Sequence, residues 1–298
     1  MGETNHPTPV SESGPRPASE TRVHWFDTQV RNRALVVLAL VMLTPLALEA
    51  IDLPVRHLAF SVFGSAIGIT LGSKAILVSA LPALTCAGVD WLLRDHPDVR
   101  QGEVPFLFPF WIAPGFAALA LALALTRIGS WPLWVAALIL GVIGIGAITL
   151  SEWFTVSPAT PGYSLSRLML TVGVYATAFA LFTLIYTTRE RSIINATLVT
   201  GVAFCLTLDL VAPHIIGLKS ALVQGLAVGV IMGQATWALN YWNISNWSAG
   251  VILLTMFYVM VGLAQQHFQD RLSRSVLFEF GGVAVIALVV AWQLSGVR

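Results

Sequence analysis

Apolar segments of about 20 residues alternate with short polar connections along most of this chain. Between residues 192 and 275 only five residues carry a formal charge: Asp209, Lys219, Asp270, Arg271 and Arg274. About 20 apolar residues coiled as a helix cross the roughly 30 Å hydrocarbon core of a bilayer, where every backbone polar group must be paired within the chain. The pattern predicts an all-α fold, a polytopic transmembrane helix bundle.

We expect about nine membrane spans, at residues 34–53, 75–93, 107–126, 130–150, 165–187, 193–211, 219–240, 247–266 and 276–295. A further apolar segment, 58–72, is short, contains Gly64, Gly68 and Gly72, and alternates in polarity over Ala66–Leu71. This period-2 pattern favours a short hairpin or re-entrant segment on the membrane surface. If 58–72 crossed the membrane instead, there would be ten spans.

The N-terminal region differs from the rest of the chain in composition. Residues 1–24 are mostly small, polar or proline, and such a segment buries too little apolar surface to fold, so we expect a disordered tail. Residues 21–33 interleave aromatic side chains with arginines, which predicts a short helix lying at the membrane interface. Residues 25–298 are expected to form a single multi-pass domain.

Composition supports the membrane class and excludes others. Hydrophobic residues make up 56% and charged residues 10% of the chain, whereas soluble proteins average roughly 25% charged residues. The net charge is +1 and no basic stripe exists, which argues against nucleic acid as a partner. Membrane lipids are the expected surroundings.

No motif in the sequence names a reaction or a cofactor. Cys86 and Cys205 each lie in an apolar segment, so neither a disulfide framework nor a metal site is expected. The metalloprotease, serine-hydrolase, P-loop and dinucleotide-binding motifs are absent. We therefore predict no cofactor and no metal.

The distribution of Lys and Arg among the connections predicts orientation. With nine spans and a cytoplasmic N-terminus, ten of these residues fall on the inner side and six on the outer side, in the sense of the positive-inside rule. We expect a multi-pass protein of the cell (cytoplasmic) membrane with its N-terminus in the cytoplasm.

Four acidic residues are expected near one face of the membrane, each on a separate helix: Asp90, Glu152, Asp209 and Glu279. Arg167 and His267 fall at a similar depth. Carboxyl groups within spans usually turn inward and mark functional sites, so this cluster is the candidate catalytic or ion-binding site. The alternative is that these are charges at helix ends that reach the headgroups, or structural ion pairs between helices.

Two features of the segment from 221 to 243 suggest contacts. Ala221, Gly225, Gly229 and Gly233 form a ridge of small residues at i+4 spacing, which lets another helix approach closely, either within the chain or in a partner or second copy. Gln234 and Asn240, followed by aromatic residues, could form a pocket for an amphipathic ligand at the membrane face opposite the four acids.

Three strings carry a resemblance to known sequences: AGVDWLLRDHP at 87–97, QATWALNYW at 234–242 and GLAQQHFQDRLSR at 262–274. With the span pattern, they resemble a family of uncharacterised bacterial (Chloroflexota-type) multi-pass membrane proteins over about residues 30–295. The resemblance implies a bacterial inner-membrane location and no known reaction. Gln234 stands where the family pattern has an acid, which puts a carboxylate role there in doubt.

Three functions remain open from the sequence. A membrane subunit or scaffold would act through helix-packing surfaces. An intramembrane enzyme acting on a lipid or a lipid-linked substrate would use the acid and histidine cluster. A transporter or permease would need polar groups around a cavity near the bilayer midplane, where Gln224 and Gln234 are the candidates.

Overall fold

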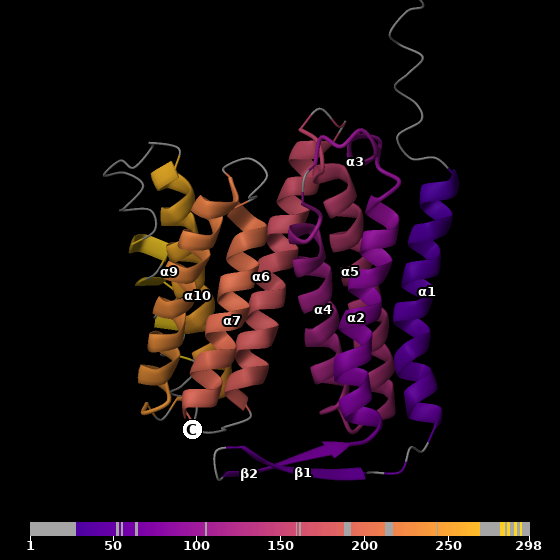
Figure 1. Ribbon diagram of the computed structural model, residues 1–298. Helices are drawn as coiled ribbons and strands as arrows, with labels where there is room; N and C mark the ends of the chain where they lie inside the picture. The colour runs from indigo at the N-terminus through magenta and orange to yellow at the C-terminus, as the bar shows by residue number, and fades with distance from the viewer. Residues whose placement is uncertain are drawn as a thin grey trace, which may run out of the picture.

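The computed structural model is a bundle of helices with one β-hairpin across its end (Figure 1). It describes residues 28–51, 54, 56–62, 65–104, 106–158, 160, 162–187, 192–211, 217–242 and 244–268, with short stretches between 281 and 293. The elements are α1 (Thr28–Ala50), β1 (Arg56–Val62), β2 (Ser65–Leu71), α2 (Ser73–Leu93), α3 (Pro97–Arg100), α4 (Pro109–Leu125), α5 (Trp131–Thr155), α6 (Tyr163–Thr187), α7 (Ser192–Val211), α9 (Leu218–Leu239) and α10 (Asn246–Phe268).

Eight of the nine expected spans are helices of this bundle, and seven described helices are long and apolar enough to cross a membrane. The exception is α4, whose 17 residues rise only about 25 Å. It packs against α2, α5, α6 and α7, so this short helix is largely enclosed by longer ones. The predicted ninth span, 276–295, and the predicted tail, 1–24, lie mainly or wholly outside the described residues.

Residues 56–62 and 65–71 pair as two antiparallel strands of a hairpin and do not form a span. β1 pairs with β2 from Arg56 opposite Leu71 to Val62 opposite Ser65. The hairpin lies crosswise to the helix axes at one end of the bundle, which we call the hairpin end (Figure 1). The alternating pattern of 66–71 thus correctly indicated strand structure, and the ten-span alternative is wrong.

The opposite end carries α3, and we call it the α3 end (Figure 1). The first turns of α1 lie there, because Arg33 Nη1 donates to the carbonyl oxygen of Trp91 near the end of α2 at 3.1 Å. At the hairpin end, Ser73 Oγ donates to the carbonyl oxygen of Ile51 at 3.3 Å. The two helices are therefore antiparallel.

The predicted interfacial helix over 21–33 is corrected by the structure. Residues 28–33 are the first turns of α1 itself, and residues 21–27 lie outside the described part. Within this part of α1, Arg33 has partners on α2 and in the connection that follows α2.

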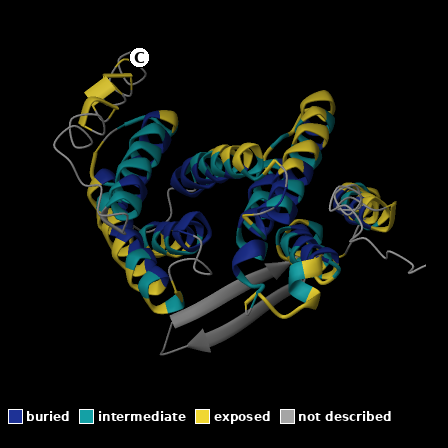
Figure 2. Cartoon of the chain, turned by 90° about the horizontal axis from the view of Figure 1, so that it is seen from above, coloured by how far each residue is buried: buried dark blue, intermediate teal, exposed yellow. Residues whose placement is uncertain are grey.

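Apolar residues cover the outside of the bundle as well as its core. On α1, which stands at the edge of the bundle in both views, Val37 and Val41 are buried, but Leu35 and Leu43 are 57% and 58% exposed (Figures 1 and 2). On α5, Leu140 is 70% exposed. Apolar surface on this scale is unfavourable in water and suits hydrocarbon. The chain is an integral membrane protein.

Candidate functional site: a buried carboxyl pair at the α3 end

Glu152 and Asp209 come together from different helices. Glu152 is in the last turn of α5 and Asp209 is in the last turn of α7, and both helices end at the α3 end. Their carboxyl groups lie close enough together to interact directly. Glu152 is 1% exposed and Asp209 is 5% exposed. This is a carboxyl pair enclosed by the protein, not a pair of helix-end charges reaching for headgroups.

The closeness of the two carboxyl groups places a condition on the protonation of the pair. An ionised carboxylate is only an acceptor, so two carboxyl groups can bond to each other only if one of them carries a proton. Two adjacent negative charges would also be unfavourable in a low dielectric. Glu152 Oε1 and Asp209 Oδ2 have no hydrogen-bond partner among the described residues. The pair therefore keeps acceptor atoms free for a further proton, a cation or water.

Arg167, on the second turn of α6, is the cation of the site. Its charge acts on both Glu152 and Asp209, and its Nη2 donates to the carbonyl oxygen of Leu210 on α7. Gln265 on α10 donates to the same oxygen through Nε2 at 3.1 Å. The site is thus assembled by α5, α6, α7 and α10.

These two donors close the end of α7. The last four carbonyl groups of a helix have no partner within it, and Leu210 is the last residue but one of α7. An unpaired carbonyl is especially costly where water is scarce, and a cation near a helix C-terminus is also favoured by the helix dipole. Arg167 therefore has a structural role beside its electrostatic one.

The other members of the predicted cluster are not part of this site as described. Asp90 pairs with Arg94, one turn further along the chain, through Oδ2 and Nε at 2.7 Å. The side chain of His267, like the whole of Glu279, lies outside the described residues. Within the described part of the chain, no group of three or more His, Cys, Asp or Glu residues could hold a metal ion.

A second polar cluster at the α3 end was not predicted from the sequence. Asp95 bridges two arginines, Arg33 of α1 at 2.5 Å and Arg100 of α3 at 2.6 Å. The guanidinium of Arg33 also lies 4.6 Å from the ring centroid of Trp91. The available signal was the polar run Arg94-Asp95-His96 directly before Pro97, which is typical of a capped turn.

His96 anchors the same connection. Its Nδ1 accepts from the backbone N–H of Asp98 and caps α3, and its ring packs edge-on against Trp153 of α5 with 4.8 Å between centroids. Burial lowers the pKa of the His96 imidazole, and the neighbouring Asp98 opposes this in part. Trp153, the residue directly after Glu152, is therefore covered by the α2–α3 connection.

The small residues of α9 face α7 within the chain. A Cβ added at Gly225 would lie 3.2 Å from the carbonyl oxygen of Phe204, and one at Gly233 would lie 3.1 Å from that of Ala196. Ala221 at the start of the ridge is fully buried. The surface formed by Ala221, Gly225, Gly229 and Gly233 is occupied by α7, so it is not open to a partner.

The region that matches a known protein family includes every residue of this site. A family model described as a protein of unknown function, DUF5656, matches residues 53–293. The chain belongs to the DUF5656 family. The matched region includes the hairpin, the carboxyl pair with Arg167, and the α9 ridge, but not α1. No curated protein and no solved structure matches the chain.

Proposed function

We propose that this DUF5656 protein binds and releases a proton through the Glu152–Asp209 pair at the cytoplasmic end of a membrane-embedded bundle. The observation that carries the proposal is that two enclosed carboxyl groups from different helices lie against each other. Ionisable groups within membrane spans are costly and are retained mainly at functional sites, including proton relays. The half-buried Arg167 lies beside the pair and offers a polar route toward the α3 end.

A proton site is favoured over the other chemistries considered for this cluster. An enzyme would need a cavity beside the acids. Among the described residues, the grooves between α7 and α9, between α5 and α6, and between α2 and α4 are lined by other side chains. A transporter would need a polar group such as Gln224 beside a cavity. Gln224 lines neither the groove between α7 and α9 nor the one between α5 and α6. A proton on one of the two carboxyl groups removes the repulsion between them, so the pair can hold a proton without any further ligand.

Infrared spectroscopy of the protein in lipid nanodiscs tests the proposal. A protonated carboxyl has a C=O stretch that is separate from the carboxylate bands and shifts in D₂O. We expect this band at neutral pH, and we expect Glu152→Gln and Asp209→Asn each to remove it. Asp90→Asn is the matched control, because Asp90 is in an ion pair with Arg94. Absence of the band from the unmodified protein would overturn the proposal.

The orientation rests on the positive-inside rule. Arg31, Arg33, Arg94 and Arg100 are at or near the α3 end, and Arg167 and Lys219 lie on helices that begin there. Arg56, Lys74 and Arg127 belong to the hairpin end. This asymmetry supports a location in the cytoplasmic membrane with the N-terminus and the carboxyl pair on the cytoplasmic side.

A second candidate function is that of a membrane subunit that associates with a second copy of itself. A groove of about 440 Å³ runs between α5 and α6 over α4, and ten of its seventeen lining residues are alanine or glycine: Ala117, Ala120, Ala124, Ala137, Gly141, Gly144, Ala147, Gly173, Ala176 and Ala180. Small residues allow the close helix approach that drives association in lipid. Unlike the α9 ridge, this surface contains an exposed glycine, Gly144, with no atom within 4 Å of an added Cβ.

Counting subunits by single-molecule photobleaching in native membrane vesicles tests this candidate. We expect dimers for the unmodified protein and monomers for Gly144→Leu, which fills the groove. Gly201→Leu is the matched control, because Gly201 is also exposed and has open space beside it but lies on α7. Monomers in every case, or equal loss with both variants, would exclude the candidate.

A further inference from the structure

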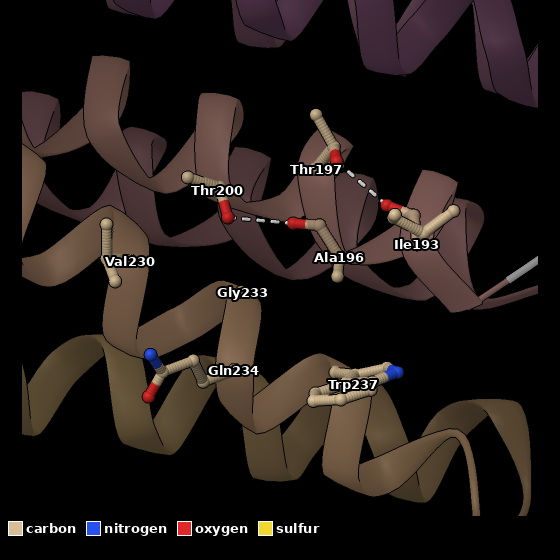
Figure 3. Close-up of a pocket in the computed structure, with 8 residues that line it drawn as sticks. All are labelled: Ile193, Ala196, Thr197, Thr200, Val230, Gly233, Gln234 and Trp237. Carbon is tan, nitrogen blue, oxygen red and sulfur yellow. Dashed lines mark hydrogen bonds between the residues drawn. The ribbon is translucent and has the colours of Figure 1, made fainter.

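A groove on the membrane-facing side of α7 and α9 differs in kind from the small-residue groove. It measures about 460 Å³, within the roughly 300–1,000 Å³ typical of ligand pockets, and it is lined by Ile193, Ala196, Thr197, Thr200, Val230, Gly233, Gln234 and Trp237. Its rim is bulky and open to the outside: Ile193 is 71% exposed and Trp237 is 54% exposed. Figure 3 shows the groove between the two helices.

Gln234 is the polar group that distinguishes this groove. Its side chain is exposed and has no hydrogen-bond partner among the described residues. The two threonine hydroxyls across the groove donate to backbone carbonyl oxygens of α7 and so are not donors to Gln234. Thr197 donates to the carbonyl of Ile193 and Thr200 to that of Ala196, each at 2.8 Å (Figure 3). The amide N–H groups of Gln234 have no acceptor among the described residues, so they are available to an acceptor supplied from outside the protein. An unpaired amide in hydrocarbon is costly, so an acceptor is expected there.

The depth of Gln234 indicates which acceptor this is. Gln234 lies five residues before the end of α9 at Leu239, or about 7.5 Å along the axis from the hairpin end. Exposed aromatic rings mark the membrane interface beyond it: Trp237 packs against Tyr241 with 6.3 Å between centroids, and Trp242 is 66% exposed. The amide therefore sits just below the headgroups, at the level of the glycerol esters of phospholipids.

We propose that this groove binds one glycerophospholipid of the leaflet at the hairpin end. An acyl chain lies along the apolar walls, and an ester carbonyl oxygen accepts a hydrogen bond from Gln234 Nε2. Trp237 packs against the glycerol region. An acyl chain suits the groove better than a helix does, because the bulky rim at Ile193, Val230 and Trp237 holds another backbone away, in contrast to the alanines and glycines between α5 and α6.

Photo-crosslinking in nanodiscs tests the site, with phospholipids that carry a diazirine on one acyl chain and either ester or ether linkages. We expect the ester lipid to label the peptides that line the groove about fivefold more than the ether lipid does, which corresponds to one hydrogen bond of about 1 kcal/mol. Gln234→Leu keeps the bulk of the side chain and removes its donor, so it should abolish this preference.

Thr197→Phe should occupy the groove and reduce labelling of its walls at least fivefold. Leu198→Phe is the matched control, since Leu198 is the next residue, is 49% exposed and does not line the groove. Equal labelling of the groove and of the lipid-facing residue Val223 would overturn the proposal, as would equal labelling by ester and ether lipids. Crosslinks from the groove to another protein chain would also overturn it.

Discussion

Gly229 of α9 lies so close to α7 that a Cβ added to it would be 2.9 Å from the carbonyl oxygen of Thr200. Real Cβ atoms do not come this close to a backbone oxygen, so only glycine fits unless the two helices separate. This contact joins α7 to α9, and α7 also carries Asp209 and Leu210 of the candidate site. Helix packing in the middle of the membrane thereby positions the polar groups at the α3 end.

Gly229→Ala should destabilise the protein although it adds a single methyl group. Separating α7 from α9 costs about 1–3 kcal/mol, as for overpacking in a core. Denaturant unfolding in mixed micelles measures the free energy. Gly201→Ala on α7 is the control, because its Cβ meets open space, and there we expect no loss or a gain of up to about 1 kcal/mol from helix propensity. Equal losses in both variants would contradict this explanation.

Arg167→Gln and Gln265→Leu should interact when combined. Each removes one donor from the carbonyl of Leu210, and we expect a loss of about 1.5–3 kcal/mol for the charged donor and 0.5–1.5 kcal/mol for the neutral one. The double variant leaves a buried carbonyl unpaired, so its loss should exceed the sum in the same unfolding measurement. Strict additivity would mean that the two side chains do not share this acceptor.

Asp95→Asn should loosen the attachment of α1 to the rest of the bundle. It removes the charge that pairs with Arg33 and Arg100, and the Arg33 pair is the more enclosed of the two. We expect a loss of about 1–2 kcal/mol, since hydrogen bonds to charged groups contribute at this level. Faster proteolysis at the N-terminal end of α1 would show the effect locally. Glu103→Gln changes an exposed acid in the next connection, between α3 and α4, and should change neither quantity.

Stability should fall as the pH is lowered through the titration of His96. Burial lowers the folded-state pKa of this imidazole below its ordinary value of 6.5, so the unfolded chain binds more protons in that range. The contribution is therefore present above pH 6.5 and is lost as the pH falls through the folded-state pKa. His96→Asn keeps an acceptor to cap α3 but cannot titrate, and thermal unfolding of this variant should depend less on pH from 7 to 5. An unchanged pH dependence would contradict the assignment.

Hydrophobic segment length located the helices well because a span is fixed by the thickness of the bilayer. The span predicted at 193–211 is α7, Ser192–Val211, and the one at 219–240 is α9, Leu218–Leu239. The prediction was less accurate where helices continue past the apolar segment. α5 extends to Thr155 through Glu152, whose side chain turns into the protein, and α1 begins at Thr28.

The candidate site was only partly predictable for a related reason. The depth of a residue in the membrane follows from its position along a predicted span. From these positions the sequence correctly predicted that Glu152, Arg167 and Asp209 lie at the same end of the bundle. The direction in which each helix faces depends on tertiary packing, which a single sequence does not give. Asp90 has the same depth, yet its partner is Arg94, the residue directly after its own helix. The Asp95 cluster lies in a connection and has no hydrophobic periodicity to reveal it.

Cysteine accessibility tests most directly the claim that the carboxyl pair lies at the cytoplasmic end of a membrane-spanning bundle. In a chain with Cys86→Ala and Cys205→Ala, single cysteines at Asp98, Ser61 and Arg127 would be treated with a membrane-impermeant maleimide, in intact cells and in inverted vesicles. The account predicts that Asp98→Cys reacts only in inverted vesicles, and that Ser61→Cys and Arg127→Cys react only in intact cells. Reaction of Asp98→Cys in intact cells, or of Ser61→Cys and Asp98→Cys from the same side, would contradict it.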